Sequence, residues 1–284
     1  MASNPSRLRD ASAPRISIIV PTFNAASLIG RCLDNLVRQS RLPDEVLVLD
    51  GGSTDGTGEV VQARASALPS LRWLSGPDRG IYDAMNKGVA LATGDWVFFL
   101  GADDQLHDAE VLQRIAAHLD DGSDFVHGDV VRVSKQRIEG GPFDHDRLCI
   151  QNICHQAIFY RRRLLERVGP YNLDYHIYAD WDLNLRCFAA GCRPRHVPIV
   201  VSLYDGGGFS ATRTDHRFLA DKLDLIARYH HVSALGRPLR PCRHEFHARA
   251  MALKDQRRWA AALGQFMVYA WHGAMVRVDR LLAR

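Results

Sequence analysis

Short apolar runs alternate with helical patterns along the first part of the chain, and this alternation restricts the possible folds more than any other feature. Runs rich in β-branched and aromatic residues predict four strands, at residues 16–20, 46–49, 71–74 and 96–100. Helices are predicted between them, at residues 25–39, after the polar loop 53–57, and at residues 81–91. Strands separated by helices form right-handed βαβ units, so we predict an α/β fold with a mostly parallel central sheet and flanking helices.

The rest of the chain is less regular. Further strands are predicted at residues 124–133, 151–160 and 195–204, and a helix is predicted at residues 180–190. From about residue 215 the pattern becomes helical and basic. We therefore divide the chain into a loose polar tail (1–14), an α/β domain (15–212) and a C-terminal helical extension (213–284).

The composition excludes several classes of protein. Among 284 residues, 46% are apolar and 24% are charged, which is typical of a globular chain and argues against a disordered or fibrous one. Residues 1–14 lack the apolar core of a signal peptide, which favours a cytoplasmic location. The net charge of +4 is too small to indicate nucleic acid as a partner, but it is compatible with phosphorylated ligands or an anionic lipid surface. None of the six cysteines forms a zinc-type pair, so we predict reduced thiols.

Polar residues follow three of the predicted strands at the point where each strand ends. They are Pro21, Thr22, Asn24, Asp50, Asp103 and Asp104. Because ligands of parallel sheets bind beyond the carboxyl ends of the strands, we expect these residues to line one site.

Asp103 and Asp104 are adjacent carboxylates that follow an apolar strand. Such a pair repels itself unless a cation or hydrogen-bond donors compensate. Carboxylate oxygens suit Mg²⁺ or Mn²⁺, which commonly add substrate phosphates to their ligands. The pair therefore predicts a divalent-metal site, and the alternative is a solvated turn in which an aspartate caps the next helix.

Asp50 and the segment around residues 77–88 carry further polar groups. A carboxylate at Asp50 can accept hydrogen bonds from a nucleobase or a ribose, and the alternative is turn chemistry with the two glycines that follow it. The segment contributes Asp78, Arg79, Asn86 and Lys87. Arg79 and Lys87 can offset the charge of a diphosphate, whereas the alternative is a solvated helix face.

These segments together resemble the family 2 glycosyltransferases. The resemblance rests on IIVPTFN (18–24), VLDGGSTDGT (48–57), NKG (86–88), GD (94–95) and FFLGADD (98–104), whose order and spacing agree. It covers about residues 16–210 and implies the GT-A fold, a nucleotide-sugar-binding α/β domain with a donor-binding half (15–104) and an acceptor and catalytic half (105–212). Residues 78–88 are similar to a bacterial subgroup that builds exopolysaccharide, capsule and lipopolysaccharide sugars.

The resemblance implies roles for the acids of the first half. Asp50 matches the carboxylate that contacts the nucleobase, and Asp103 matches the acid near the ribose. Asp104 matches the last acid of the DxD-type motif, which holds the metal on the donor diphosphate. The family usually carries a second acid directly after the residue that Asp50 matches, whereas this chain has Gly51, which leaves the choice of nucleotide open.

The resemblance also implies a catalytic base in the second half. Asp180 matches the catalytic aspartate that opens a helix, although Ala179 replaces the glutamate that usually precedes it. A carboxylate is also stabilised at a helix N-terminus, so the alternative for Asp180 is a helix cap.

Other polar residues are predicted on the acceptor side or near the donor phosphates. His155 and Gln156 are similar to a His-Gln segment of the same bacterial subgroup, and we place them on the acceptor side. Gly207 and Ser210 belong to a glycine-rich loop that we expect to close over the donor phosphates.

The last part of the chain predicts an amphipathic helix. Apolar residues recur at helical spacing between residues 263 and 282, with arginines among and beside them. Such a helix can lie in a membrane interface, and the alternative is packing against the catalytic domain or another subunit. Gln265 and His272 interrupt the apolar run, which argues against a transmembrane span.

We therefore predict an inverting glycosyltransferase that uses Mn²⁺ or Mg²⁺. Its donor is a nucleotide sugar, with UDP favoured over GDP and dTDP, and its acceptor is a glycan or lipid-linked glycan. Two rival hypotheses are a nucleotidyltransferase and a catalytically inactive nucleotide-sugar-binding protein, the latter supported by Gly51 and Ala179. The absence of a glycine fingerprint after the first strand argues against a dinucleotide-dependent oxidoreductase.

Overall fold

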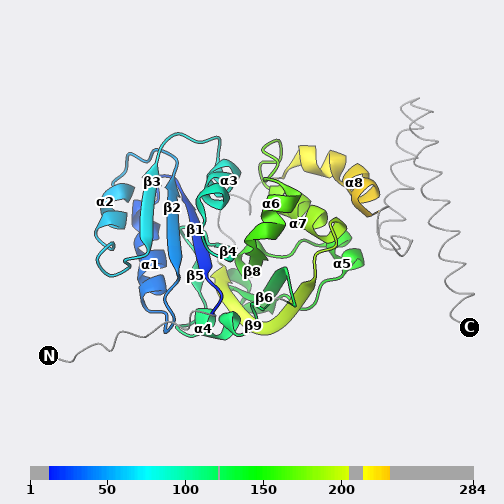
Figure 1. Ribbon diagram of the computed structural model, residues 1–284. Helices are drawn as coiled ribbons and strands as arrows, with labels where there is room; N and C mark the ends of the chain where they lie inside the picture. The colour runs from blue at the N-terminus through cyan, green and yellow to red at the C-terminus, as the bar shows by residue number, and fades with distance from the viewer. Residues whose placement is uncertain (1–12, 121, 205–213, 231–284) are drawn as a thin grey trace, which may run out of the picture.

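The computed structural model describes residues 13–120, 122–204 and 214–230 (Figure 1). Within these residues, nine strands form one sheet: β1 (Ile16–Thr22), β2 (Glu45–Asp50), β3 (Leu71–Ser75), β4 (Trp96–Phe99), β5 (Gln105–Leu106), β6 (Phe125–Arg132), β7 (Arg137–Glu139), β8 (Ile158–Arg161) and β9 (Pro194–Tyr204). The α-helices are α1 (Ala26–Val37), α2 (Thr57–Gln62), α3 (Ile81–Leu91), α4 (Val111–Ala116), α5 (His145–Ile150), α6 (Arg162–Val168), α7 (Ala179–Ala189) and α8 (His216–His230). Two short 3₁₀ helices are η1 (Val133–Lys135) and η2 (His155–Ala157).

The sheet is mixed, and its two halves differ in strand direction. The order is β3-β2-β1-β4-β8-β6-β9-β5, with β7 paired to β6. Strands β3, β2, β1 and β4 are all parallel, whereas β8 runs antiparallel to β4 and to β6. The predicted α/β class is confirmed, and the predicted parallel strands make up the first half of the sheet.

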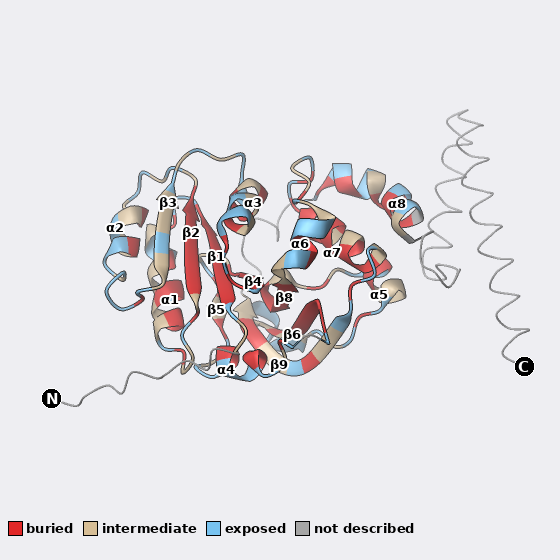
Figure 2. Ribbon diagram, viewed as in Figure 1, coloured by how far each residue is buried: buried red, intermediate tan, exposed pale blue. Residues whose placement is uncertain are grey.

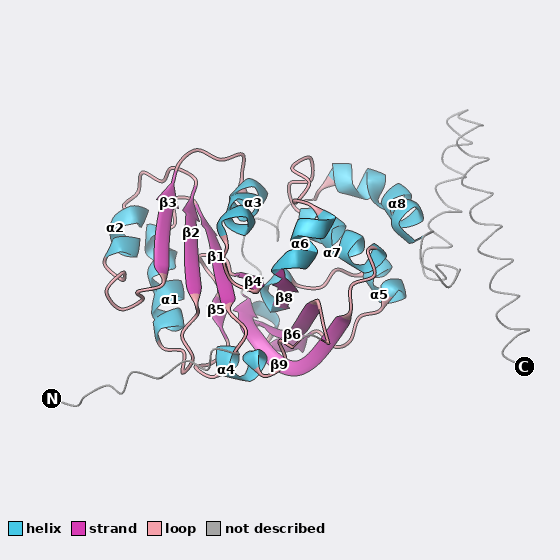
Figure 3. Ribbon diagram, viewed as in Figure 1, coloured by secondary structure: helices cyan, strands magenta, loops and turns pink. Residues whose placement is uncertain are grey.

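Helices cover both faces of the sheet, as Figure 3 shows. Alternate residues of each central strand point to opposite faces, so neighbours such as Phe98 and Phe99 belong to two different cores. The face that carries Phe98 packs against α1, α2 and α4, and the face that carries Phe99 packs against α3, α5, α6, α7 and α8. Strands β1 and β4 are buried throughout (Figure 2), which agrees with their mainly apolar sequences.

Two sequence-based predictions about strands were wrong. Pro21 does not end the first strand, since β1 continues to Thr22. Proline is tolerated there because the pairing of β1 with β4 stops at Ile19, and the missing N–H breaks no ladder. Residues 151–157 are not a strand: they form bends and the short helix η2, and only Ile158–Arg161 joins the sheet as β8.

Helix α8 begins the predicted C-terminal extension and packs on the α/β domain. Phe218 is fully buried in the same core as α7, and its ring lies 5.4 Å from that of Trp181. The predicted tail residues 1–12, the loop residues Gly207 and Ser210, and the amphipathic stretch 263–282 lie outside the described residues. Within the described part of the chain, no helix combines the length and apolar character needed to cross a bilayer.

Candidate active site

A cavity of about 700 Å³ opens where the two halves of the sheet meet. Its first wall comes from the loops after β1 and β4 and from the start of α3. Its second wall comes from residues 151–157, from the residues that lead into α7, and from β6, β7 and β9. Seven of the predicted site residues line it, and they are Pro21, Asn24, Asp103, Asp104, His155, Gln156 and Asp180.

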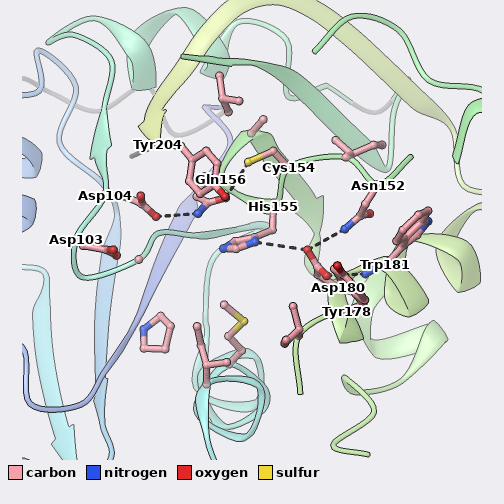
Figure 4. Close-up of a pocket in the computed structure, with 18 of the residues that line it drawn as sticks. Asp103, Asp104, Asn152, Cys154, His155, Gln156, Tyr178, Asp180, Trp181 and Tyr204 are labelled. Atoms are coloured by element: carbon pink, nitrogen blue, oxygen red, sulfur yellow. Dashed lines mark hydrogen bonds and ion pairs between the residues drawn. The ribbon is translucent and has the colours of Figure 1, made fainter. Parts of the chain in front are cut away.

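Asp103 and Asp104 lie on the first wall, directly after β4 (Figure 4). Both carboxylates converge over Gly101, since a Cβ atom on that glycine would lie 2.5 Å from Asp104 Oδ2 and 2.9 Å from Asp103 Oδ1. Burial, and then the negative charge of Asp103, raise the pKa of Asp104 from 3.8 to about 6. The pair therefore combines an exposed carboxylate, Asp103, with a buried one, Asp104, and the two negative charges lie side by side.

The segment that includes His155 and Gln156 joins the two walls of the cavity. Gln156 Nε2 donates a hydrogen bond of 2.9 Å to Asp104 Oδ2, and its Oε1 lies 2.8 Å from the thiol of Cys154. The backbone of Gln156 is held in turn by Ser202, whose hydroxyl donates to its carbonyl oxygen at 2.8 Å. His155 points the other way, and its Nδ1 lies 3.5 Å from Asp180 Oδ2.

Asp180 lies in the first turn of α7 and is 8% exposed. Its Oδ1 accepts the backbone N–H of Trp181 at 2.8 Å, and its Oδ2 accepts Nδ2 of Asn152 at 2.9 Å. The indole of Trp181 donates to the carbonyl oxygen of Leu148 and so ties the start of α7 to α5. The side chain is therefore a buried acceptor of hydrogen bonds that lines the cavity.

The acids of the first wall fit a divalent cation of the Mg²⁺ or Mn²⁺ type. The observation that supports this fit is the convergence of two carboxylates over Gly101, one of them buried with a raised pKa. Within the described residues, no group of three or more His, Cys, Asp or Glu side chains is placed to hold a metal ion. A metal at this site would therefore take the remaining ligands from water and substrate phosphates, as Mg²⁺ commonly does.

Asp50 lies in a second, smaller cavity of about 190 Å³ together with Asp78 and Lys87. Its carboxylate is 3% exposed and accepts hydrogen bonds from the hydroxyls of Ser53 and Ser75. The carboxylate of Asp78 lies against Gly51, where a Cβ atom would come within 2.8 Å of Asp78 Oδ2. The carboxylate of Asp78, from the loop after β3, thus occupies the space that a side chain at residue 51 would fill, in the cavity that Asp50 lines.

A hydrogen-bond chain connects the two cavities. Ser53, which donates to Asp50, accepts the backbone N–H of Asn24 at 2.7 Å. Asn24 Oδ1 accepts the backbone N–H of Thr54 at 3.1 Å, and Asn24 lines the larger cavity. The residue has a φ of 46°, a left-handed conformation that asparagine tolerates better than most residues do. The prediction that all of these strand ends line one site is therefore wrong in part, because Asp50 lies in the smaller cavity, which is linked to the larger one by these hydrogen bonds.

Three predicted residues line neither cavity. Thr22 is buried, and its hydroxyl donates to the carbonyl of Val20. The amide of Asn86 is engaged by both backbone groups of Tyr171, and Arg79 is an exposed partner of Asp83. The donor-binding roles of these three residues stay predictions. Lys87 lines the smaller cavity, but its ammonium group already contacts Asp83 and the carbonyl oxygen of Pro77.

Asn152 and Trp181 are the residues at this site that sequence reasoning missed. Asn152 escaped because residues 151–160 were interpreted as a strand. The signal that contradicts a strand is the polar content of QNICHQ (151–156), which does not alternate with apolar residues. Another missed feature is the pair of Arg132 and Glu139 on the β6–β7 hairpin, which lines the cavity with an N–O distance of 3.0 Å.

Comparison with known proteins identifies relatives over most of the chain. Residues 17–176 match the family described as Glycosyl transferase family 2. A "PGL/p-HBAD biosynthesis glycosyltransferase" of Mycobacterium bovis is 47% identical over 214 residues, which cover 73% of this chain and 84% of the relative. An uncharacterized glycosyltransferase of Mycobacterium tuberculosis is 32% identical over 231 residues, which cover 77% of this chain and 86% of the relative.

Solved structures share the GT-A fold at low sequence identity. S. aureus TarS 1–349 in complex with UDP-GlcNAc has a TM-score of 0.66 and 21% identity, with 90% of this chain and 81% of that chain covered. The chain spans half the length of full TarS, with a TM-score of 0.67. The mannosyltransferase PcManGT of Pyrobaculum calidifontis, in complex with GDP-Man and Mn²⁺, has a TM-score of 0.57 and 22% identity, with 92% and 87% covered. With the family match over more than half of its residues, the chain belongs to glycosyl transferase family 2 and is a glycosyltransferase.

Proposed function

We propose that the protein transfers a sugar from a nucleotide-sugar donor, with UDP favoured, to a glycan or lipid-linked glycan acceptor, with inversion at the anomeric carbon. The observation that carries the proposal is the presence of Asp104 and Asp180 in one cavity, contacted by the adjacent residues Gln156 and His155. Such a transfer requires a group that holds a metal on the leaving diphosphate and a separate base that accepts the proton of the acceptor. The acidic pair suits the first role, and the buried Asp180 suits the second.

Asp180 accepts the proton of the acceptor hydroxyl as this oxygen attacks the anomeric carbon from the side opposite the nucleotide. Base catalysis of this kind typically contributes about 10²–10⁴-fold. The sugar is held between the base and the acidic pair, and positioning contributes the remaining acceleration. Asp104, with Asp103 beside it, would hold Mn²⁺ or Mg²⁺, which when bound stabilises the charge on the leaving diphosphate.

The second cavity supports a site for the nucleoside. Asp50 and Asp78 offer carboxylate oxygens, which accept hydrogen bonds from base N–H and ribose O–H groups. Structural neighbours bind both UDP-GlcNAc and GDP-Man, so the fold by itself does not select the base. The preference for UDP is therefore the finer part of the proposal.

The rim of the large cavity supports an acceptor with an apolar part. Phe23, Leu28 and Ile81 line it and are 64%, 38% and 41% exposed. Large apolar side chains that gather at the mouth of a site favour a ligand with apolar surface, such as the lipid of a lipid-linked glycan. Such an acceptor would place the protein at a membrane surface, at its cytoplasmic face.

The experiment is a panel of UDP-, GDP- and dTDP-sugars, scored for Mn²⁺-dependent release of the nucleoside diphosphate with water as a slow acceptor. We expect turnover with one nucleotide class, abolished in Asp180→Asn and in Asp104→Asn. Asp108→Asn, which changes an acid outside both cavities, serves as the control. Binding of a nucleotide sugar without turnover, once glycan and lipid-linked acceptors are added, would favour an inactive binding protein. Pyrophosphate formation from a sugar phosphate and a nucleoside triphosphate would favour a nucleotidyltransferase.

A further inference from the structure

We infer that Asn152, Asn184 and Tyr160 are positioning residues, which form a hydrogen-bonded chain that orients the carboxylate of Asp180. The inference rests on the proposed role of Asp180 as the base. None of the three residues was expected at the site from the sequence, and only Asn152 lines the cavity.

The chain has three links between Asp180 and the core. Asn152 Nδ2 donates to Asp180 Oδ2 at 2.9 Å, and Asn184 Nδ2 donates to Asn152 Oδ1 at 2.9 Å. The hydroxyl of Tyr160 donates to Asn184 Oδ1 at 2.7 Å. All three lengths are those of good hydrogen bonds.

The charge of Asp180 sets the direction of every link. An ionised carboxylate only accepts hydrogen bonds, so Asn152 must present its NH₂ group to Asp180 and its oxygen to Asn184. Asn184 must then present its own NH₂ group to Asn152, which leaves its oxygen for the hydroxyl of Tyr160. The hydrogen-bonded chain thus offers Asp180 one N–H donor in a defined orientation. A donor at this position is complementary to the ionised carboxylate, which is the form that can accept a proton.

The far end of the chain is immobilised by packing. Tyr160 lies on β8 and is fully buried, with the rings of Phe125 and Phe99 at 5.1 Å and 6.0 Å in edge contacts. Asn184 is fully buried one helical turn after Asp180, on the same face of α7. Two buried side chains that do not line the cavity, Asn184 and Tyr160, therefore determine where Asn152 holds the carboxylate.

The two oxygens of Asp180 are held separately. Oδ1 accepts the backbone N–H of Trp181, and Oδ2 accepts Asn152, so rotation of the carboxylate would break both bonds. These bonds use two of about four lone-pair positions on the carboxylate, and His155 Nδ1 lies 3.5 Å from Oδ2, which leaves at least one position for the acceptor hydroxyl. Loss of the Asn152 link frees this rotation, and misplacement by about 1 Å is enough to lower a rate by roughly 10²-fold.

The test compares Asn152→Ala and Tyr160→Phe with the unchanged protein. The substrate is the nucleotide sugar that gives the fastest release of nucleoside diphosphate in the donor panel. We expect Asn152→Ala to lower kcat by about 10–100-fold and Tyr160→Phe by roughly 3–10-fold, with the KM for the donor changed less than about 2-fold. Asn35→Ala is the matched control, because Asn35 is a buried amide that bonds Leu106 on the other side of the sheet. It should lower the melting temperature and leave kcat unchanged.

The double variant identifies whether Tyr160 acts through Asn152. If it does, adding Tyr160→Phe to Asn152→Ala produces no further loss of kcat, since the link is already cut. Three outcomes would overturn the inference while Asp180→Asn remains inactive. They are losses of kcat that multiply in the double variant, a rise in donor KM that accounts for the whole effect of Asn152→Ala, and an unchanged kcat in Asn152→Ala. Full activity of Asp180→Asn would instead refute the proposed base, and the inference with it.

Discussion

Asp104 and Asp180 are buried acids in the same cavity, yet the protein surrounds them in different ways. Asp104 accepts one side-chain hydrogen bond, from the neutral amide of Gln156, and has the carboxylate of Asp103 beside it. Asp180 receives a backbone N–H and an asparagine amide, with His155 close by. Burial and the neighbouring Asp103 leave the pKa of the first acid raised despite Gln156, whereas the second acid accepts two hydrogen bonds from the protein. This difference fits the proposed roles of metal ligand and base.

The largest effect should come from Asp180→Asn. An amide cannot accept the proton, so we expect transfer to fall by about 10²–10⁴-fold. Because Asp180 lies outside the cavity that holds Asp50, nucleotide affinity should stay within about 2-fold, as measured by calorimetry with the nucleoside diphosphate and Mn²⁺. Normal transfer by this variant would show that another group is the base.

Asp104→Asn should stabilise the protein while it abolishes the response to Mn²⁺. The raised pKa of Asp104 means that its charged form opposes folding at high pH. A shift of this size corresponds to about 2–3 kcal/mol, which the variant should gain in free energy of unfolding at pH 8. The gain should shrink as the pH falls through about 6 and vanish near 3.8, where the carboxyl is protonated in both folded and unfolded chains. Urea unfolding at pH 8 and pH 5 measures it.

Equal stability of Asp104→Asn and the unchanged protein at pH 8 would contradict the burial of this carboxyl group beside Asp103.

Gly101→Ala tests whether the two carboxylates must converge. The added methyl group would meet Asp104 Oδ2 and Asp103 Oδ1, both at the ends of side chains, so the acids should move and the fold should persist. We expect the half-saturating Mn²⁺ concentration to rise by about 10-fold, roughly the loss of one good ligand contact. Gly122→Ala is the matched control, because its methyl group would approach Asp120 Oδ1 far from the cavity. An unchanged Mn²⁺ requirement in Gly101→Ala would contradict a metal site there.

The smallest effect should come from Gly51→Ala, which applies the same change to the second cavity. Its methyl group would displace the carboxylate of Asp78. Nucleotide affinity should weaken by roughly 3-fold, with the Mn²⁺ requirement unchanged. A titration with UDP and GDP measures it, and a loss confined to one of them would indicate which base the cavity accepts. If the variant binds UDP and GDP each with the same affinity as the unchanged protein, Asp78 does not take part in base recognition.

The first half of the fold could be predicted from the sequence because its signals are local. Strands β1 to β4 and helix α3 lie within two residues of their predicted bounds, since each depends on apolar residues close together in the chain. The second half was predicted poorly. Helices α4, α5 and α6 were missed, and residues 151–157 were assigned to a strand. These elements are short, and their apolar residues pack mainly against distant parts of the chain.

The same division holds for the site. Asp104 follows a strand whose burial is evident from four consecutive apolar residues, so its place at a strand end was predictable. Asp180 was identified by resemblance, and its partner Asn152 was not identified at all. No local pattern links residues 28 positions apart, as Asn152 and Asp180 are.

The sequence by itself determined the order of strands and helices in the first half, from β1 to β4, and the position of the acids at the ends of β2 and β4. These features follow from side-chain periodicity and backbone preference, which act over a few residues. Only the tertiary structure decided that Asp104 and Asp180 line one cavity, that Asp50 lies in another, and that Asn184 and Tyr160 lie behind the base. Those placements depend on packing of the irregular segment 151–157 between β4 and α7, and contacts between distant residues form only when the whole chain is folded.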